Sequence, residues 1–203
     1  MKSIINNILK LKRYIKRYFY IYWNYLKFYL KDVKFGKKLR IYTQIYLEVN
    51  SNSSISIGDN FTFTSNDCIN PLCRNIRGCI VSYANAHIVI GNNVGMSSSC
   101  LWAQKSITIG NNVNIGGDCI IMDSDAHSLK YMDRRNPIND KANKKDEPII
   151  IEDDVLVGTR CIILKGVTIG ARSVIGSGSV VTKSIPSDCI AAGNPCKVIR
   201  YIN

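Results

Sequence analysis

The second half of this 203-residue chain places an aliphatic residue at every sixth position. The positions in strict register are Ile151, Val157, Ile163, Ile169, Ile175 and Val181. A period of six matches neither the 3.6-residue period of a helix nor the two-residue alternation of a lone strand. It matches a coil of three short strands and three tight corners, with one inward aliphatic side chain on each side. Stacked coils of this kind form a solenoid around one continuous apolar column.

A small or apolar residue also occurs four positions after each of these aliphatics. These residues are Val155, Cys161, Val167, Ser173, Ser179 and Ile185. The same phase appears upstream from Ile90 and Ile109, and fainter repeats begin at Phe35 and Ile57. In the repeat from Ile90, the spacing predicts Met96 and Trp102 as inward residues and Cys100 at the small inward position. The alternative fold is an antiparallel sandwich with evenly spaced turns.

The strong basic charge of the chain comes from its beginning. Residues 1–40 contain twelve Lys and Arg and one acidic residue. The rest of the chain contains fifteen Lys and Arg and fourteen acidic residues. Apolar residues at the beginning of the chain recur every three or four positions, which predicts an amphipathic helix. They are Ile4, Ile8, Leu11, Ile15, Phe19, Tyr22, Leu26 and Tyr29. We therefore expect a basic helical segment at 1–34 and a β-helix domain at 35–203, interrupted by a charged excursion at about 126–148.

Two uses of this helical segment are open, and a third is disfavoured. It could lie on an anionic membrane surface through residues 1–32, or cap the open end of the solenoid. Nucleic-acid binding is not expected, because no recognised nucleic-acid module accompanies the charge. The longest uncharged run, residues 18–26, is far shorter than the ~20 residues that span a bilayer.

The cysteines and the N-terminus bear on the compartment. The eight cysteines form no C-x-x-C pair, and Cys100, Cys119 and Cys161 fall at small inward positions. Free thiols are therefore expected rather than disulfides. Residues 1–31 carry charges throughout and no small-residue cleavage site, so no secretory signal is evident. The expected location is the cytoplasm, with a peripheral position on the inner face of the membrane as a further option.

Several motifs together resemble one family. They are Asp125-Ala126-His127, Pro148-Ile149-Ile150-Ile151, the run from Gly176 to Pro186 and the run from Ala192 to Arg200. The chain resembles the hexapeptide-repeat acyltransferases, and within them the galactoside/maltose O-acetyltransferases and polysaccharide O-acetyltransferases. The resemblance implies an all-β, left-handed parallel β-helix with a long inserted loop. It also implies a homotrimer with sites between protomers, and acetyl-CoA as co-substrate with no metal.

The catalytic residues that the resemblance implies begin with His127 as general base. A neutral imidazole suits proton removal from a sugar hydroxyl near pH 7. The second nitrogen of its ring needs a partner, for which Asp125 is favoured over Asp123. The backbone of Gly158 and Thr159 is expected to stabilise the oxyanion. A zinc enzyme of the same fold is disfavoured, because three histidine ligands are needed and only His87 and His127 exist.

The coenzyme and acceptor positions also come from the resemblance. The coenzyme residues are Thr159, Ser177, Thr182, Lys183, Lys197 and Arg200. The galactoside and maltose enzymes hold the sugar with an Asn and an Asp. Met96 and Gln104 stand at those two positions, and Ser97, next to Met96, could take over the contact there. Ser97 and Gln104 are thus the expected acceptor residues, and a surface polysaccharide or lipid-linked glycan is the expected acceptor. The alternatives are a xenobiotic acetyltransferase and a non-catalytic scaffold.

Overall fold

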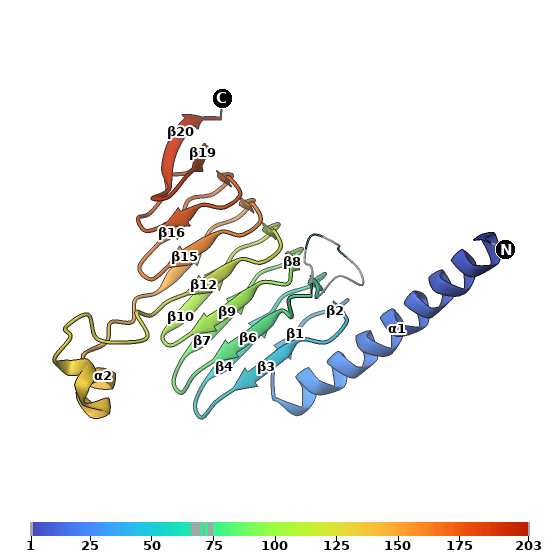
Figure 1. The fold of residues 1–203 in the computed structure, drawn as a ribbon, viewed down its shortest axis with the longest axis horizontal. Coiled ribbons are helices and arrows are strands. Elements are labelled where there is room, and N and C mark those ends of the chain that lie inside the picture. The colour runs from blue at the N-terminus through green and yellow to red at the C-terminus, as the bar shows by residue number, and fades with distance from the viewer. Residues whose placement is uncertain (1, 66–69, 71, 73–74, 203) are drawn as a thin grey trace.

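The computed structural model describes residues 2–65, 70, 72 and 75–202. It shows a three-sided β-helix that follows one long helix, α1 (Lys2–Leu30), as Figure 1 shows. Each coil adds one strand to each of three sheets, and neighbouring strands pair in parallel apart from β19 and β20, which are antiparallel. The predicted N-terminal amphipathic helix is confirmed.

The three sheets follow one another along each coil. The first sheet contains β1 (Lys34–Phe35), β4 (Ser54–Ile57), β7 (His87–Ile90), β10 (Ser106–Ile109), β13 (Ile149–Ile151) and β16 (Thr168–Ile169). The second contains β2 (Arg40–Tyr42), β5 (Thr62–Thr64), β8 (Gly95–Ser97), β11 (Asn114–Ile115), β14 (Leu156–Val157), β17 (Val174–Ile175), β19 (Cys189–Ala192) and β20 (Lys197–Tyr201). The third contains β3 (Tyr46–Val49), β6 (Cys79–Ser82), β9 (Cys100–Ala103), β12 (Ile120–Met122), β15 (Ile162–Leu164) and β18 (Val180–Val181).

The predicted apolar column runs through the middle of the three sheets. All six aliphatics in strict register are fully buried, and so are the residues four positions later, with Ile185 the most accessible at 5%. The two serines of this column satisfy their hydroxyls internally. Ser173 donates to the carbonyl of Pro186 at 2.7 Å and Ser179 to the carbonyl of Gly176 at 2.5 Å. Burying these hydroxyls therefore leaves no unmet hydrogen bond.

Asparagine and aspartate side chains tie the coils together at one corner. The side-chain oxygen of Asn92 accepts from the Asp59 N–H at 2.8 Å, and that of Asn111 accepts from the Asn92 N–H at 2.9 Å. Asp153 continues the ladder by accepting from the Asn111 N–H at 2.6 Å. Asn112, which follows Asn111, has a φ of 58°, a left-handed conformation that asparagine tolerates better than most residues. The corner residues thus supply both the turn and the contact between coils.

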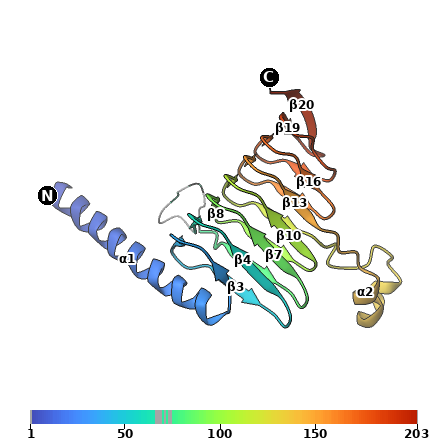
Figure 2. The same ribbon diagram turned by 180° about the vertical axis from the view of Figure 1, so that it is seen from behind.

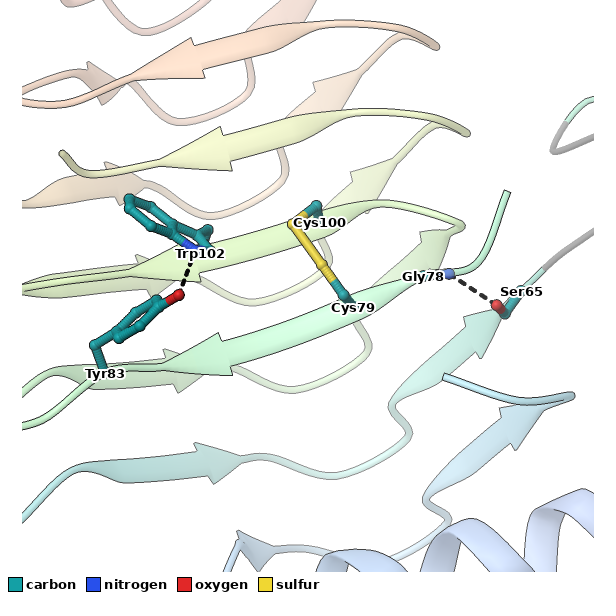
Figure 3. The surroundings of a disulfide bond; sticks show 6 residues. All are labelled: Ser65, Gly78, Cys79, Tyr83, Cys100 and Trp102. Carbon is teal, nitrogen blue, oxygen red and sulfur yellow. Dashed lines mark hydrogen bonds between the residues drawn. A yellow bond between two sulfur atoms is a disulfide. The ribbon is translucent and has the colours of Figure 1, made fainter. Parts of the chain in front are cut away.

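One coil differs from the prediction. Leu101 and not Trp102 points into the core, so Cys100 faces outward and Ser99 takes the small inward position. Cys100 lies opposite Cys79 of the neighbouring strand, and the two form a disulfide with a Cα–Cα separation of 4.6 Å (Figure 3). The expectation of free thiols is wrong for this pair. It is confirmed for Cys119, Cys161, Cys189 and Cys196, which are free and buried, whereas Cys68 and Cys73 lie outside the described residues.

The C-terminal end of α1 covers the first coil. Phe28 is fully buried, and the side-chain amide of Asn24 donates to the carbonyls of Ile41 at 3.1 Å and Thr43 at 2.8 Å. Lys27 donates to the carbonyl of Ile45 at 2.9 Å, and the loss of solvent there lowers the pKa of the Lys27 ammonium. The capping contacts expected of this segment are therefore present. The rest of α1 extends away from the solenoid, as both ribbon views show (Figures 1 and 2).

The predicted excursion leaves the solenoid between β12 and β13, at the corner that joins the third sheet to the first. It contains a short 3-10 helix, η2 (Asp133–Arg135), and a helix, α2 (Pro137–Asn143). Asn136 caps α2, because its side-chain oxygen accepts from the Ile138 N–H at 2.9 Å. The excursion projects on the side of the solenoid opposite α1 (Figures 1 and 2).

Candidate active site

His127 lies in the excursion with its ring accessible to solvent and one nitrogen held by a carboxylate. Its Nδ1 is 2.6 Å from Oδ2 of Asp140 in α2, and the side chain is 69% exposed. A carboxylate only accepts, so the Nδ1–H donates and the Nε2 lone pair is left to accept a proton. The other oxygen of Asp140 accepts from the Ser128 N–H at 2.7 Å. The hydrogen bonds from His127 and Ser128 lower the pKa of the Asp140 carboxyl.

The expected pairing of Asp125 with His127 is wrong. Oδ1 of Asp125 lies 2.9 Å from the ammonium of Lys165, in an ion pair with the solenoid. The chain turns between the two residues at Ala126, whose φ is 63°. Sequence proximity therefore does not bring their side chains together, and Asp140 takes the position expected of Asp125.

Asp123 and Gln104 anchor the base of the excursion. The buried Asp123 carboxylate accepts from the backbone N–H groups of Gln104 at 2.7 Å and Lys105 at 2.8 Å. Burial raises the pKa of this carboxyl, although these hydrogen bonds oppose the rise. The Gln104 side chain accepts from the Lys144 ammonium at 3.3 Å. The structure thus places Gln104 beneath the excursion.

A groove of about 420 Å³ runs along the second sheet. It brings together three of the predicted residues, Ser97, Thr159 and Ser177. Ser97 accepts from the Thr64 hydroxyl at 2.8 Å. A second cavity of about 440 Å³ is also lined by Thr159 and Ser177, together with Arg160. Ser97 and Gln104, the two expected acceptor residues, are therefore on different parts of the surface.

The backbone N–H groups expected to stabilise an oxyanion already have acceptors within the chain. The N–H of Gly158 donates to the carbonyl of Ile175 at 2.8 Å. The N–H of Thr159 donates to the Ser177 hydroxyl at 3.2 Å, which is the longer contact. Neither group is free for an oxyanion in this conformation, which differs from the expectation.

The remaining coenzyme candidates lie towards the C-terminal end of the solenoid. Thr182 and Lys183 are exposed after β18, and Lys197 and Arg200 are exposed on β20. None of the four is among the described residues that line the groove or the second cavity. Their roles stay predictions.

His127 and the groove cannot meet within one chain. The excursion leaves the corner between the third and first sheets, whereas the groove runs along the second sheet, which is the side opposite that corner. Within residues 2–65, 70, 72 and 75–202, no group of three His, Cys, Asp or Glu side chains is placed to hold a metal ion.

Comparisons with known proteins agree with this architecture. Residues 148–183 match a family model described as the hexapeptide repeat of succinyl-transferase. This segment of the chain is similar to the hexapeptide repeats of that family. The chain is similar to a crystal structure of a hexapeptide-repeat-containing acetyltransferase from Vibrio cholerae, with 28% identity, a TM-score of 0.52, and coverage of 77% of this chain and 74% of that one. The predicted left-handed parallel β-helix is confirmed.

Two curated relatives share shorter segments. The galactoside O-acetyltransferase of Escherichia coli K12 is 49% identical over 72 residues, which cover 34% of this chain and 36% of the relative. The 2,3,4,5-tetrahydropyridine-2,6-dicarboxylate N-acetyltransferase of Staphylococcus aureus strain Newman is 47% identical over 53 residues. These cover 26% of this chain and 22% of the relative. The matched segments thus span about a third or less of the length of these relatives.

The sequence did not point to Asp140. The run Asn136-Pro137 was an available signal, since asparagine at a cap and proline at the first helical position mark a helix start. That signal would have predicted α2, with Asp140 in its first turn. It would not have shown that Asp140 faces His127, because that contact depends on how the whole excursion folds.

Proposed function

We propose that this protein is an acyltransferase that moves an acetyl group from acetyl-CoA to a hydroxyl of a glycan. The observation that carries the proposal is the His127–Asp140 pair, in which Nδ1 is bound at 2.6 Å and the His127 side chain is 69% exposed. This is the arrangement that a general base for hydroxyl activation requires. The similarity to acetyltransferases supports the choice of the acetyl group.

In the proposed reaction, Nε2 of His127 takes the proton of the acceptor hydroxyl as its oxygen attacks the thioester carbonyl. Asp140 stabilises the imidazolium that forms, through the Nδ1–H. The tetrahedral intermediate then collapses by breaking the carbon–sulfur bond, and the imidazolium returns its proton to the departing thiolate. The products are an O-acetyl ester and CoA, with His127 neutral again.

We further propose a homotrimer in which His127 of one protomer completes the groove of another. The position of His127 at the corner opposite the groove supports this arrangement, because no one chain brings the two together. Ser97 in the groove would contact the acceptor, and the exposed Thr182, Lys183, Lys197 and Arg200 would hold the coenzyme.

The test is calorimetric titration of acetyl-CoA into the protein, followed by thioester hydrolysis in the same sample. We expect binding, and slow hydrolysis that falls by about 10²- to 10⁴-fold in His127→Ala while binding is kept. His87→Ala is the matched control, since His87 is the other histidine and is exposed on β7. Absence of acetyl-CoA binding would favour a non-catalytic scaffold, and equal activity in His127→Ala would refute the base.

A further inference from the structure

The two sides of α1 have different surroundings. One side faces the first coil, where Asn24 and Phe28 are fully buried. The opposite side carries large apolar residues that remain in solvent, with Ile8 60%, Ile15 61% and Tyr22 72% exposed. We call this second side the outward face of α1. Its other members are Ile4, Leu11, Phe19, Leu26 and Tyr29.

Helix geometry makes the capping side and the outward face independent. Leu26 is two residues from both Asn24 and Phe28, which places it about 160° around the helix from each. Capping therefore uses none of the outward face, and the two uses considered for this segment do not exclude one another. A soluble protein rarely leaves a continuous apolar stripe of this length uncovered.

Lysines border the apolar surface on the outward face. A cavity of about 500 Å³ lies against Ile8, Leu11, Ile15 and Phe19 and is edged by Lys12 and Lys16. A second of about 160 Å³ lies against Trp23, Leu26 and Leu30 and is also lined by Lys31. Lys27 beside it belongs to the cap, through its hydrogen bond to the carbonyl of Ile45. The sequence of α1 contains no aspartate or glutamate. Every charged side chain of the helix is therefore basic.

We propose that the outward face of α1 docks on an anionic lipid surface. Apolar side chains would enter the boundary between headgroups and acyl chains, and the bordering lysines would lie at the anionic headgroups. Tyr22 and Trp23 suit this depth, because their rings are apolar with one polar atom. The helix would lie parallel to the surface, because its apolar face runs along its length. None of the helices among the described residues is long and apolar enough to cross a membrane.

Charge distinguishes the lipid surface from a second copy of α1. Two outward faces packed together would bring Lys12 and Lys16 of one copy near those of the other. The sequence of α1 contains no carboxylate, so two copies of the helix would bring only like charges together. An anionic surface is opposite in sign to the helix.

Docking would also place the groove near the lipid. α1 packs against β2, and the groove begins on the neighbouring strand β5 at Thr62 and Thr64. A lipid-linked glycan could then reach the groove from the membrane. This consequence rests on the proposed function, whereas the docking itself does not.

The experiment is flotation of the full chain with vesicles of equal phosphatidylcholine and phosphatidylglycerol, and with vesicles of phosphatidylcholine alone. We expect binding to the anionic vesicles only. Ile15→Glu should lower the partition by about ten-fold or more, because it puts a charge at the apolar boundary. Ile138→Glu is the matched control, since Ile138 is 78% exposed on α2 and far from this face.

The lysines provide a second arm. Lys12→Gln with Lys16→Gln should weaken the partition by about five-fold for each lysine. Lys105→Gln with Lys141→Gln removes the same charge from exposed positions elsewhere and should have a much smaller effect. Added salt should weaken binding of the unchanged protein.

Three results would overturn the proposal. They are no binding to either vesicle, equal binding to both, and binding that Ile15→Glu leaves unchanged. If Ile15→Glu lowers the oligomeric mass while no vesicle binds, a second copy covers this face. Calorimetric titration of acetyl-CoA into Ile15→Glu separates this test from that of the proposed function, because neither the groove nor the proposed coenzyme residues include any residue of α1.

Discussion

Asp140 holds His127 by a hydrogen bond of 2.6 Å between Oδ2 and Nδ1, although thirteen positions separate the two residues in the chain. Asp140 is itself fixed by the cap of α2 and by the Ser128 N–H at 2.7 Å. The ring orientation of His127 therefore depends on the folded excursion. Residues that shape the excursion should affect catalysis even where they touch no substrate.

The first prediction concerns the tautomer of His127. Asp140→Asn replaces an obligate acceptor by a group that both donates and accepts, so Nδ1–H is no longer enforced. We expect kcat/KM for acetyl transfer to fall by about 10²- to 10⁴-fold, with acetyl-CoA binding unchanged. Asp188→Asn is the control. It also removes a carboxylate from an ion pair, the one between Asp188 and Arg172, but at a place away from the groove. Equal losses in the two variants would show a general effect of removing carboxylates.

The second prediction concerns acid stability. The pKa of the Asp140 carboxyl is lowered in the folded protein, so its contacts stabilise the fold above the unfolded pKa and are lost as pH falls through the folded value. The free energy of unfolding of the unchanged protein should therefore exceed that of Asp140→Asn at neutral pH. The difference should shrink below about pH 4. Denaturant unfolding measured across this range checks it; a pH-independent difference would contradict the assigned contact.

The repeat made the solenoid predictable, because one rule fixes each coil. Every sixth residue must be apolar, and this requirement is visible from Ile151 to Val181. The left-handed corners are less visible, because Arg160 and Arg172 occupy two of them. The prediction failed in the coil of Cys100, where the inward spacing from Met96 to Leu101 is five. Leu101 and Trp102 are both apolar, so composition could not show which of them faces inward.

The candidate-site residues show a similar limit. The motif around His127 indicates it as the base, which stays a prediction, and the groove brings together the predicted residues Ser97, Thr159 and Ser177. The placement of His127 relative to the groove residues was not predictable, because the repeat alone does not indicate from which side of the solenoid an excursion leaves. The same reason explains why the sequence favours a near neighbour of His127, Asp125, and does not indicate Asp140.

The third prediction concerns the cap of the solenoid. Phe28 is fully buried against the first coil, so Phe28→Ala should lower the free energy of unfolding by about 3–5 kcal/mol. Tyr29→Ala changes the next residue, which is 68% exposed, and should stay within about 0.5 kcal/mol. Denaturant unfolding of the two variants provides the comparison. Equal stability of both would mean that α1 is not anchored by Phe28.

The fourth prediction concerns the distance between coils at the asparagine ladder. A Cβ added at Gly110 would lie 2.8 Å from the backbone nitrogen of Asp153, closer than the coils allow. Gly110→Ala should therefore lower the free energy of unfolding by about 1–3 kcal/mol, because the neighbouring coils must move apart. Gly178→Asn is the contrasting variant. A Cβ there meets nothing within 4 Å, and asparagine tolerates the φ of 76°, so we expect a loss below about 1 kcal/mol. Thermal and denaturant unfolding would measure both, and a larger loss for Gly178→Asn would show that backbone conformation, rather than coil spacing, limits these corners.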